Sequence, residues 1–509
     1  MAGYDEKDII QHYSGWIAYR NSDRTFPLGM AMDMAWGDGT CISFTDSIPW
    51  VAIAFKLIRR FLPDTFQYFG IYALFCYIMQ GIAAFNIIYY KCRNTIYSAI
   101  GTTLFTFAPI LLERSFRHTA LGSQWLILFA ILIFLVHRDT PHKFHYLGYL
   151  ALLVLAVGIH PYFLPPIAVF FLASVIYDVT RKQFMAPVFF IASLFITYFS
   201  GCLIGVLGTN TNVSRDGYGY YSMNLNALIN PTSCGDYVWS SFQKVYPQTL
   251  GNYDGFNYLG AGIIAGLFLI FIFTLAYGNK KNIRQFIKRN FILLLLLLCC
   301  FLFAISNVVT LNDKILFDVP LPQWMEKLCG IFRASSRIFY PVYYCIFICI
   351  VYGIWQFSVS RLSKTKAYII LGLIMAIQLF DIHSCIIEKH QMMNKNASYT
   401  SLLDDQVLND ILQNNQYLIL DNYSGDSRSL AVVALKNHMK LYYSTANSGA
   451  YWSAYNNSIE IASTAKETGE IKSYVIVTSD AATAGSYLKH ENIECYRSNE
   501  NYYLFQRFI

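Results

Sequence analysis

Charged side chains are scarce in this sequence. They make up 14% of its 509 residues, whereas about 25% is usual in soluble domains. Hydrophobic residues account for 55%, and the mean hydropathy is +0.38. This composition excludes an ordinary soluble domain and predicts a protein of the lipid bilayer. The aromatic content of 17% suits the belts that aromatic side chains form at membrane surfaces.

Two further absences narrow the function. The net charge of +7 is not gathered in a basic stripe between polar loops, which argues against nucleic-acid binding. The 12 cysteines form no CxxC pair and no Cys/His cluster with zinc spacing, and most lie in apolar runs as small hydrophobic residues. A disulfide is left open only among the cysteines expected outside the membrane, which are Cys41, Cys234, Cys329 and Cys495.

Long apolar runs dominate the first three quarters of the chain. A membrane-spanning helix needs about 20 mostly apolar residues. The fourth and fifth runs are short and are separated by His160-Pro161, which predicts a hairpin because proline interrupts helical hydrogen bonding. The ten predicted spans are residues 66–90, 96–112, 119–136, 146–159, 162–177, 184–207, 258–277, 291–310, 338–357 and 367–385.

Basic residues fix the orientation of these spans. Five loops that follow alternate spans carry Lys and Arg, and such loops stay on the cytoplasmic side. The sequence therefore predicts an integral protein of the plasma (cytoplasmic) membrane, with residues 1–65, 208–257, 311–337 and 386–509 outside. The basic residues are Lys91, Arg93, Arg138, Lys143, Arg181, Lys182, Lys280, Lys281, Arg284, Lys288, Arg289, Arg361, Lys364 and Lys366.

The N-terminal segment is unusual for this topology. Residues 1–46 are polar and contain neither a signal peptide nor a first span, although the threading places them outside. Either the chain inserts with its N-terminus outside unaided, or Met1 is an internal methionine of a longer reading frame. We favour the second interpretation, in which an upstream helix is missing from this chain.

The composition changes after Cys385. Short apolar runs at residues 417–420, 440–444, 474–477 and 502–505 are bounded by Asn, Gly, Ser and Asp, as strands are. Helices are expected at residues 402–412 and 427–437. The predicted organisation is a first outer loop (1–65), a helical membrane domain (66–385) with outer loops 208–257 and 311–337, and a soluble extracytoplasmic α/β domain (396–509).

The first outer segment contains a candidate general base. Asp8, Gln11 and His12 stand at positions i, i+3 and i+4, so in a helix they share one face. A carboxylate beside a membrane surface can have a raised pKa and accept a proton during catalysis. A solvated helix cap is the alternative interpretation of the same residues.

Further candidates lie at the outer ends of the predicted spans. His118, His160 and Asp254 are ionisable groups near membrane depth, where such groups are costly and often functional. A histidine at a helix end can equally be a structural hydrogen-bonding residue. Arg333 and Arg337 stand four residues apart and form a fork suited to phosphate. Pairing of these arginines with a carboxylate of a neighbouring loop is the alternative.

An ordered run of motifs resembles an uncharacterised family of bacterial polytopic membrane proteins. The motifs cover most of residues 8–345, and that family is in turn similar to the GT-C glycosyltransferases. They are DxxQHYxGW (8–16), FPLG (26–29), FTDSIP (44–49), RHTAL with QW (117–125), HPYF (160–163), GYYSMNL (219–225), GFNYLG (255–260) and FRASSR (332–337).

The resemblance implies an integral membrane enzyme that takes a sugar from a polyprenyl-phosphate donor. Enzymes of the GT-C type use an acidic residue in the first extracytoplasmic loop, just after the first helix. Asp8 matches that position best, with the adjacent Asp5-Glu6 pair as a rival. This chain departs from the pattern because it lacks the first helix.

The resulting hypothesis is inverting glycosyl transfer to an envelope glycan, lipid or protein on the outer face. Asp8 is the expected base, Arg333 and Arg337 stabilise the leaving phosphate, and the C-terminal domain recognises the acceptor or covers the site. The residues expected to contact substrate are Gln11, His12, His118 and His160. Asp46 and Asp254 are expected to bind sugar hydroxyls or a divalent metal, although the sequence shows no metal-specific spacing.

Two other classes of function stay open on the sequence. One is a flippase or transporter of a lipid-linked substrate, with the arginines as a gate. It would be favoured by paired inverted repeats, and only one broken helix is evident, at His160-Pro161. The other is a non-catalytic assembly protein for envelope polysaccharide.

Overall fold

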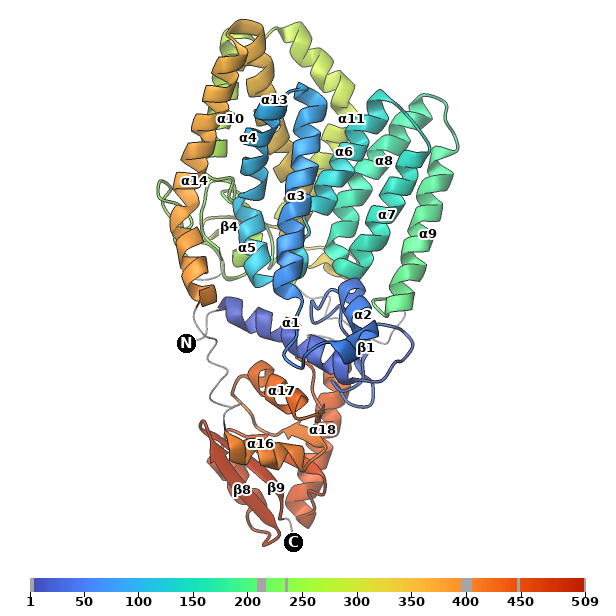
Figure 1. Ribbon diagram of the computed structural model, residues 1–509, viewed down its shortest axis with the longest axis vertical. Helices are drawn as coiled ribbons and strands as arrows, with labels where there is room; N and C mark the ends of the chain where they lie inside the picture. Colours follow the sequence, from blue (N-terminus) through green and yellow to red (C-terminus); the bar gives the residue numbers. More distant parts are fainter. Residues whose placement is uncertain (1–3, 208–216, 234–236, 395–404, 446–448, 508–509) are drawn as a thin grey trace. The chain divides into compact units, whose positions relative to one another are not determined.

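The computed structural model describes residues 4–207, 217–233, 237–394, 405–445 and 449–507 (Figure 1). Contacts divide the chain into two units. Unit 1 combines Met1–Gln67, Tyr198–Ser214 and Lys395–Ile509, whereas unit 2 combines Tyr68–Thr197 and Arg215–Asn394. The ends of the chain therefore belong to one unit, and the middle of the chain forms the other.

Unit 2 is a bundle of apolar helices (Figure 1). Some pairs of helices adjacent in the sequence pack against each other, and the later helices α10, α13 and α14 also contact one another. The main helices are α3 (Phe69–Cys92), α4 (Thr95–Thr106), α5 (Pro109–Arg117), α6 (Trp125–Asp139), α7 (Phe144–Ile159), α8 (Leu164–Thr180), α9 (Ala186–Ile204, whose last turns count with unit 1), α10 (Ala261–Tyr277), α11 (Lys280–Ile305), α12 (Gln323–Cys329), α13 (Tyr340–Arg361) and α14 (Lys364–Asn394).

Seven helical segments in the described residues are long and apolar enough to cross a membrane, as a polytopic membrane protein requires. Of the ten predicted spans, the fourth and seventh correspond to the shorter apolar helices α7 and α10. The second is α4 followed by α5, bent by 49° at the break. The bend arises because Pro109 has no N–H to continue α4 and instead begins α5.

Two other local features test the sequence-based expectations. The hairpin at His160-Pro161 is confirmed: α7 ends at Ile159, and a short 3₁₀ turn (Pro161–Phe163) leads into α8. The eighth predicted span extends too far, since α11 ends at Ile305. Val308–Leu311 instead forms strand β3, which pairs antiparallel with β4 (Lys314–Asp318).

Unit 1 contains the mixed sheet expected in the C-terminal segment. Its strand order is β6-β5-β7-β9-β8, with β5 parallel to β6 and β7, and β9 antiparallel to β7 and β8. Ile419, Ile476 and Leu504 from three strands are buried in its core. The elements are α16 (Gln406–Gln413), β5 (Tyr417–Leu420), α17 (Ser427–Lys436), β6 (Lys440–Leu441), α18 (Gly449–Thr468), β7 (Tyr474–Thr478), α19 (Ala481–Tyr487), β8 (Ile493–Ser498) and β9 (Asn501–Gln506).

The N-terminal segment completes this unit. It consists of α1 (Tyr4–Asn21), the short strands β1 (Met30–Ala31) and β2 (Thr40–Cys41), and α2 (Pro49–Leu57). Leu441 of β6 donates its N–H to the Asp33 carbonyl at 2.9 Å, and the Trp36 N–H returns a bond of 2.8 Å to the Leu441 carbonyl. Helix α1 also packs on α17. The first predicted outer loop and the predicted C-terminal domain thus fold together.

Candidate functional site

Helix α1 presents the predicted Asp8 face within unit 1. The helix is held by Trp16, which is completely buried and donates from Nε1 to the Phe66 carbonyl at 2.9 Å. Asp8, Gln11 and His12 follow the expected i, i+3, i+4 spacing on this helix. Asp8 and Gln11 are half-buried, whereas His12 is buried, so the face runs from the surface into the unit.

The segment that contains Asp46 contacts this face. Gln11 Nε2 donates to the Phe44 carbonyl at 3.4 Å, and the Ser47 hydroxyl donates to the His12 carbonyl at 2.9 Å. His12 Nε2 and Asp46 Oδ2 lie 3.9 Å apart, so a protonated His12 forms an ion pair with Asp46. The structure therefore brings Gln11, His12 and Asp46 together.

Gly15 explains how α1 approaches this segment so closely. A Cβ atom at position 15 would lie 2.1 Å from Thr45 Oγ1 and 2.5 Å from Ser47 Oγ. Only glycine leaves room for the two hydroxyl side chains at this point of the helix. The glycine of the DxxQHYxGW motif thus serves the contact between α1 and the Asp46 segment.

Asp8 pairs with a residue of the C-terminal segment. Its Oδ1 lies 3.8 Å from Nη1 of Arg428, which stands in the first turn of α17. The Asp8 side chain is 22% exposed and that of Arg428 is 30% exposed. This pair could not be predicted from the sequence. Asp8 and Arg428 lie near opposite ends of the chain, and no sequence motif contains both.

A second cluster lies in unit 2 around Asp254. Arg114 donates from Nη1 to Asp254 Oδ1 at 2.8 Å and from Nη2 to the Asp254 carbonyl at 2.6 Å. Arg337 adds two bonds of 3.0 Å, from Nε to Oδ2 and from Nη2 to Oδ1. Arg117 Nη2 lies 3.7 Å from Oδ1. For Arg337, pairing with a loop carboxylate is the interpretation that the structure supports.

This environment decides what Asp254 can bind. Burial alone raises the pKa of the Asp254 carboxyl, but Arg114 and Arg337 hold that pKa well below its ordinary value. The side chain is only 5% exposed. Because three guanidinium groups surround the carboxylate, a divalent cation is repelled there. The expected contact of Asp254 with sugar hydroxyls or a metal stays a prediction.

Several predicted motifs converge on the Asp254 cluster. The Ser336 hydroxyl donates to the Asp254 carbonyl at 3.1 Å, and the Ala334 N–H donates to the Tyr162 hydroxyl at 2.9 Å. The Arg337 guanidinium lies 4.7 Å from the centre of the Tyr162 ring, within cation–π range. The motifs FRASSR and HPYF therefore meet in one network with Asp254, the residue that precedes GFNYLG.

Arg333 differs from Arg337 although both belong to the same motif. It is half-buried, and its guanidinium lies 5.7 Å from the centre of the Tyr221 ring. Among the described residues, no carboxylate lies within ion-pair distance of Arg333. Its positive charge is therefore the one in this motif that is not already matched by Asp254.

The two predicted histidines of unit 2 lie at helix ends. His160 follows α7, is buried, and accepts the Tyr162 N–H at Nδ1 over 3.3 Å, as a structural hydrogen-bonding residue does. His118 follows α5 and donates its backbone N–H to the Arg114 carbonyl at 2.8 Å. Of the outer cysteines, Cys41, Cys329 and Cys495 are free thiols, while Cys234 lies outside the described residues.

Comparison with known proteins gives the family. A family model described as a domain of unknown function (DUF6311) matches residues 2–383, and the chain belongs to that family. No curated protein matches the chain. The matched range includes α1 and the Asp254 cluster but ends before the C-terminal segment that contains Arg428.

Proposed function

We propose that this member of the DUF6311 family is a membrane glycosyltransferase that moves a sugar from a polyprenyl-phosphate donor to a hydroxyl acceptor. The observation that carries the proposal is the α1 face, where a half-buried carboxylate stands one turn from Gln11 and His12. On the same face, Nη1 of Arg428 lies 3.8 Å from Oδ1 of Asp8. The resemblance to the GT-C enzymes supports the same assignment.

The proposed step is a single inverting displacement. The acceptor oxygen attacks the anomeric carbon of the sugar, a new C–O bond forms, and the bond from that carbon to the phosphate oxygen breaks. Asp8 takes the proton of the acceptor hydroxyl, and polyprenyl phosphate leaves with the bonding electron pair. Gln11 and His12 orient the acceptor or the sugar from the same helix face.

The two arginines of the FRASSR motif receive different roles. Arg333 is the proposed partner of the donor phosphate, where negative charge develops during transfer. Arg337 binds Asp254 through two of its nitrogens and is proposed to position the loop that carries Arg333. The proposed acceptor is an envelope glycan, lipid or protein. The distribution of basic loops in the sequence supports chemistry on the extracytoplasmic side.

The test uses the full chain in detergent with a panel of polyprenyl-phosphate sugars, with any upstream helix that the gene encodes restored. Asp8→Asn is expected to lower kcat by about 10²–10⁴-fold, as loss of a general base does, with donor affinity unchanged. Arg333→Gln is expected to weaken donor binding by about tenfold or more, as loss of a charge-assisted hydrogen bond does. Asp5→Asn tests the rival carboxylate, and Asp23→Asn, an exposed position of the same unit, is the control.

Unchanged turnover in Asp8→Asn would refute the assigned base. Donor binding without turnover, equal in all variants, would favour the flippase or the assembly protein. The assembly interpretation also predicts that Asp8 and Arg337 tolerate substitution while surface changes in residues 396–509 do not.

A further inference from the structure

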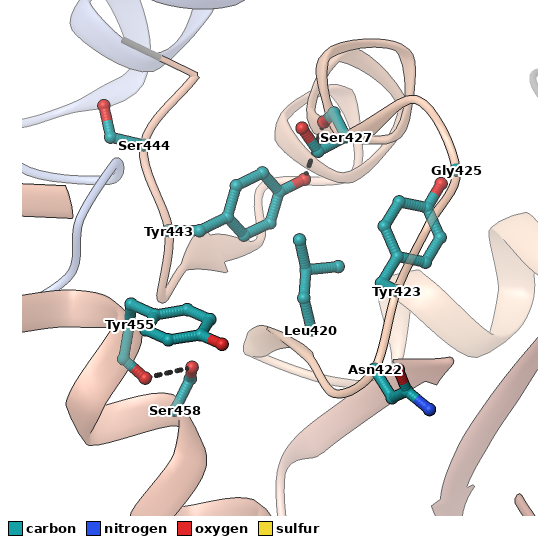
Figure 2. Close-up of a pocket in the computed structure, with 9 residues that line it drawn as sticks. All are labelled: Leu420, Asn422, Tyr423, Gly425, Ser427, Tyr443, Ser444, Tyr455 and Ser458. Atoms are coloured by element: carbon teal, nitrogen blue, oxygen red, sulfur yellow. Dashed lines mark hydrogen bonds between the residues drawn. The ribbon is translucent and has the colours of Figure 1, made fainter. Parts of the chain in front are cut away.

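A pocket of about 340 Å³ lies in unit 1 at the carboxyl ends of two parallel strands (Figure 2). The chain leaves β5 through Asn422 and Tyr423, and it leaves β6 through Tyr443 and Ser444; all four residues line the pocket. The volume falls within the ~300–1,000 Å³ of small-molecule sites. No residue of this pocket was among the binding residues predicted from the sequence.

The topology favours ligand binding at this position. Strand β5 lies between β6 and β7: the connection that follows it leads to β6 on one side, while β7 lies on its other side. In open α/β sheets, ligands bind beyond the carboxyl ends of the strands where the connections change direction. The pocket occupies that end of β5, so its place in the fold is that of a binding site.

The lining combines aromatic rings with neutral hydrogen-bonding groups. Figure 2 shows the side chains of Tyr423, Tyr443 and Tyr455 arranged around that of Leu420. The Tyr443 hydroxyl donates to the Ser427 carbonyl at 3.0 Å, which leaves its oxygen able to accept a hydrogen bond. Burial, and secondly the charge of Asp426, raise the pKa of Tyr423 to about 12, so this phenol stays neutral near pH 7.

The charges nearby disfavour an anionic ligand. None of the described residues that line the pocket is charged. Helix α17 begins at the pocket, but Asp426 caps it and accepts the Arg428 N–H at Oδ1 over 3.2 Å. The carboxylate already occupies the helix end at which a phosphate would otherwise bind. Arg428, the nearest cation of this turn, is directed to Asp8.

We infer that this pocket binds a neutral sugar unit. Tyrosine rings suit the apolar face of a pyranose, and the hydroxyl and amide groups of Tyr443, Ser458 and Asn422 suit its hydroxyls. Ser427 lines the pocket and Arg428, the next residue, contacts Asp8, so one turn of α17 links the pocket to the α1 face. That the bound sugar belongs to the acceptor glycan rests on the proposed function; the binding itself does not.

The test is saturation-transfer NMR on the purified full chain in detergent, without any lipid donor. The probes are three neutral disaccharides (cellobiose, chitobiose and mannobiose) and two anionic sugars (glucose 6-phosphate and glucuronic acid), each up to the millimolar range. Tyr455→Ala removes a ring that is 39% exposed and therefore leaves the fold intact. Ile459→Ala is the matched control, since it lies one turn further along α18, is 49% exposed and does not line the pocket.

The expected result is NMR saturation transfer to at least one neutral disaccharide. This signal is expected to fall at least fivefold in Tyr455→Ala and to stay unchanged in Ile459→Ala. Asp8→Asn is expected to bind that sugar normally, which separates the pocket from the proposed catalysis. The inference is overturned if none of the three neutral probes shows saturation transfer. It is also overturned if saturation transfer to the anionic probes is equal or stronger. Either of these results leaves a measured Asp8-dependent turnover standing.

Discussion

Asp254 and Asp8 are both aspartates paired with arginine, but they differ in almost every other respect. Asp254 in unit 2 is 5% exposed and accepts bonds of 2.8–3.0 Å from Arg114 and Arg337. Asp8 in unit 1 is 22% exposed and lies 3.8 Å from Arg428, beyond hydrogen-bond length. One carboxylate is fully matched by its neighbours, whereas the other keeps access to solvent.

The contrast between Asp254 and Asp8 indicates which carboxylate can take part in catalysis. A buried carboxylate enclosed by guanidinium groups holds its proton affinity low and its oxygens occupied, so it serves as a structural centre. A half-buried carboxylate that lies 3.8 Å from a cation can still meet a substrate hydroxyl. Charge near a membrane surface is thus not by itself a sign of catalysis; the burial of the carboxylate and the distance to its arginine partners separate the two roles.

The largest expected effect is on the stability of unit 2. Asp254→Asn leaves Arg114 and Arg337 buried without a counter-charge, which is expected to cost about 3–5 kcal/mol. Thermal unfolding followed by intrinsic fluorescence in detergent, together with the yield of monodisperse protein, measures the loss. Asp8→Asn removes only a partly exposed pair, for which about 0–1 kcal/mol is expected. Equal losses in the two variants would refute the contrast between them.

A smaller effect is expected at the contact between α1 and the Asp46 segment. Gly15→Ala places a methyl group 2.1 Å from Thr45 Oγ1, and such overpacking is expected to cost about 1–3 kcal/mol. Because Asp46 moves with this segment, turnover in the proposed reaction also falls. The control is Gly485→Ala in α19, where a Cβ meets nothing within 4 Å; there alanine is expected to stabilise by about 0.5–1 kcal/mol. A gain in stability at both glycines would contradict the close approach.

The sequence predicted those parts of the fold that depend on local composition. Apolar runs predicted the helices, and Pro161 indicated the hairpin between α7 and α8. The limits appear where an apolar run changes structure. Pro109 bends the second span, and Val308–Leu311 forms a strand although its composition continues the preceding helix.

The candidate sites were predictable only in part, for a similar reason. Helical spacing placed Asp8, Gln11 and His12 on one face without any knowledge of tertiary contacts. The partners of Asp8 and of Arg337 required the fold, because Arg428 and Asp254 are distant in sequence and many charged residues competed for each pairing. The pocket at β5 could not be predicted from the sequence for the same reason, since it depends on the order of the strands in the sheet and not on a sequence motif.

The third expected effect concerns the pH dependence of unit 1, through Lys56 in α2. Its Nζ lies 3.9 Å from the centre of the Tyr19 ring and donates to the Asp23 carbonyl at 3.2 Å. Burial, and secondly Arg59, lower the pKa of Lys56 to about 8. Between pH 8 and the ordinary lysine value of about 10.4, the unfolded chain binds a proton that the folded chain has lost, so stability rises with pH. An increase of about 1–3 kcal/mol is expected over this range, seen as a higher Tm at pH 9.5 than at pH 7.5. Lys56→Met removes most of this increase, whereas Lys472→Met, at a lysine that is 75% exposed, leaves it in place. A Tm that falls over this range in wild type but not in Lys56→Met would contradict the lowered pKa. It would show that the folded state favours the charged amine, because the attraction of the Tyr19 ring for the ammonium group exceeds the cost of burying its charge.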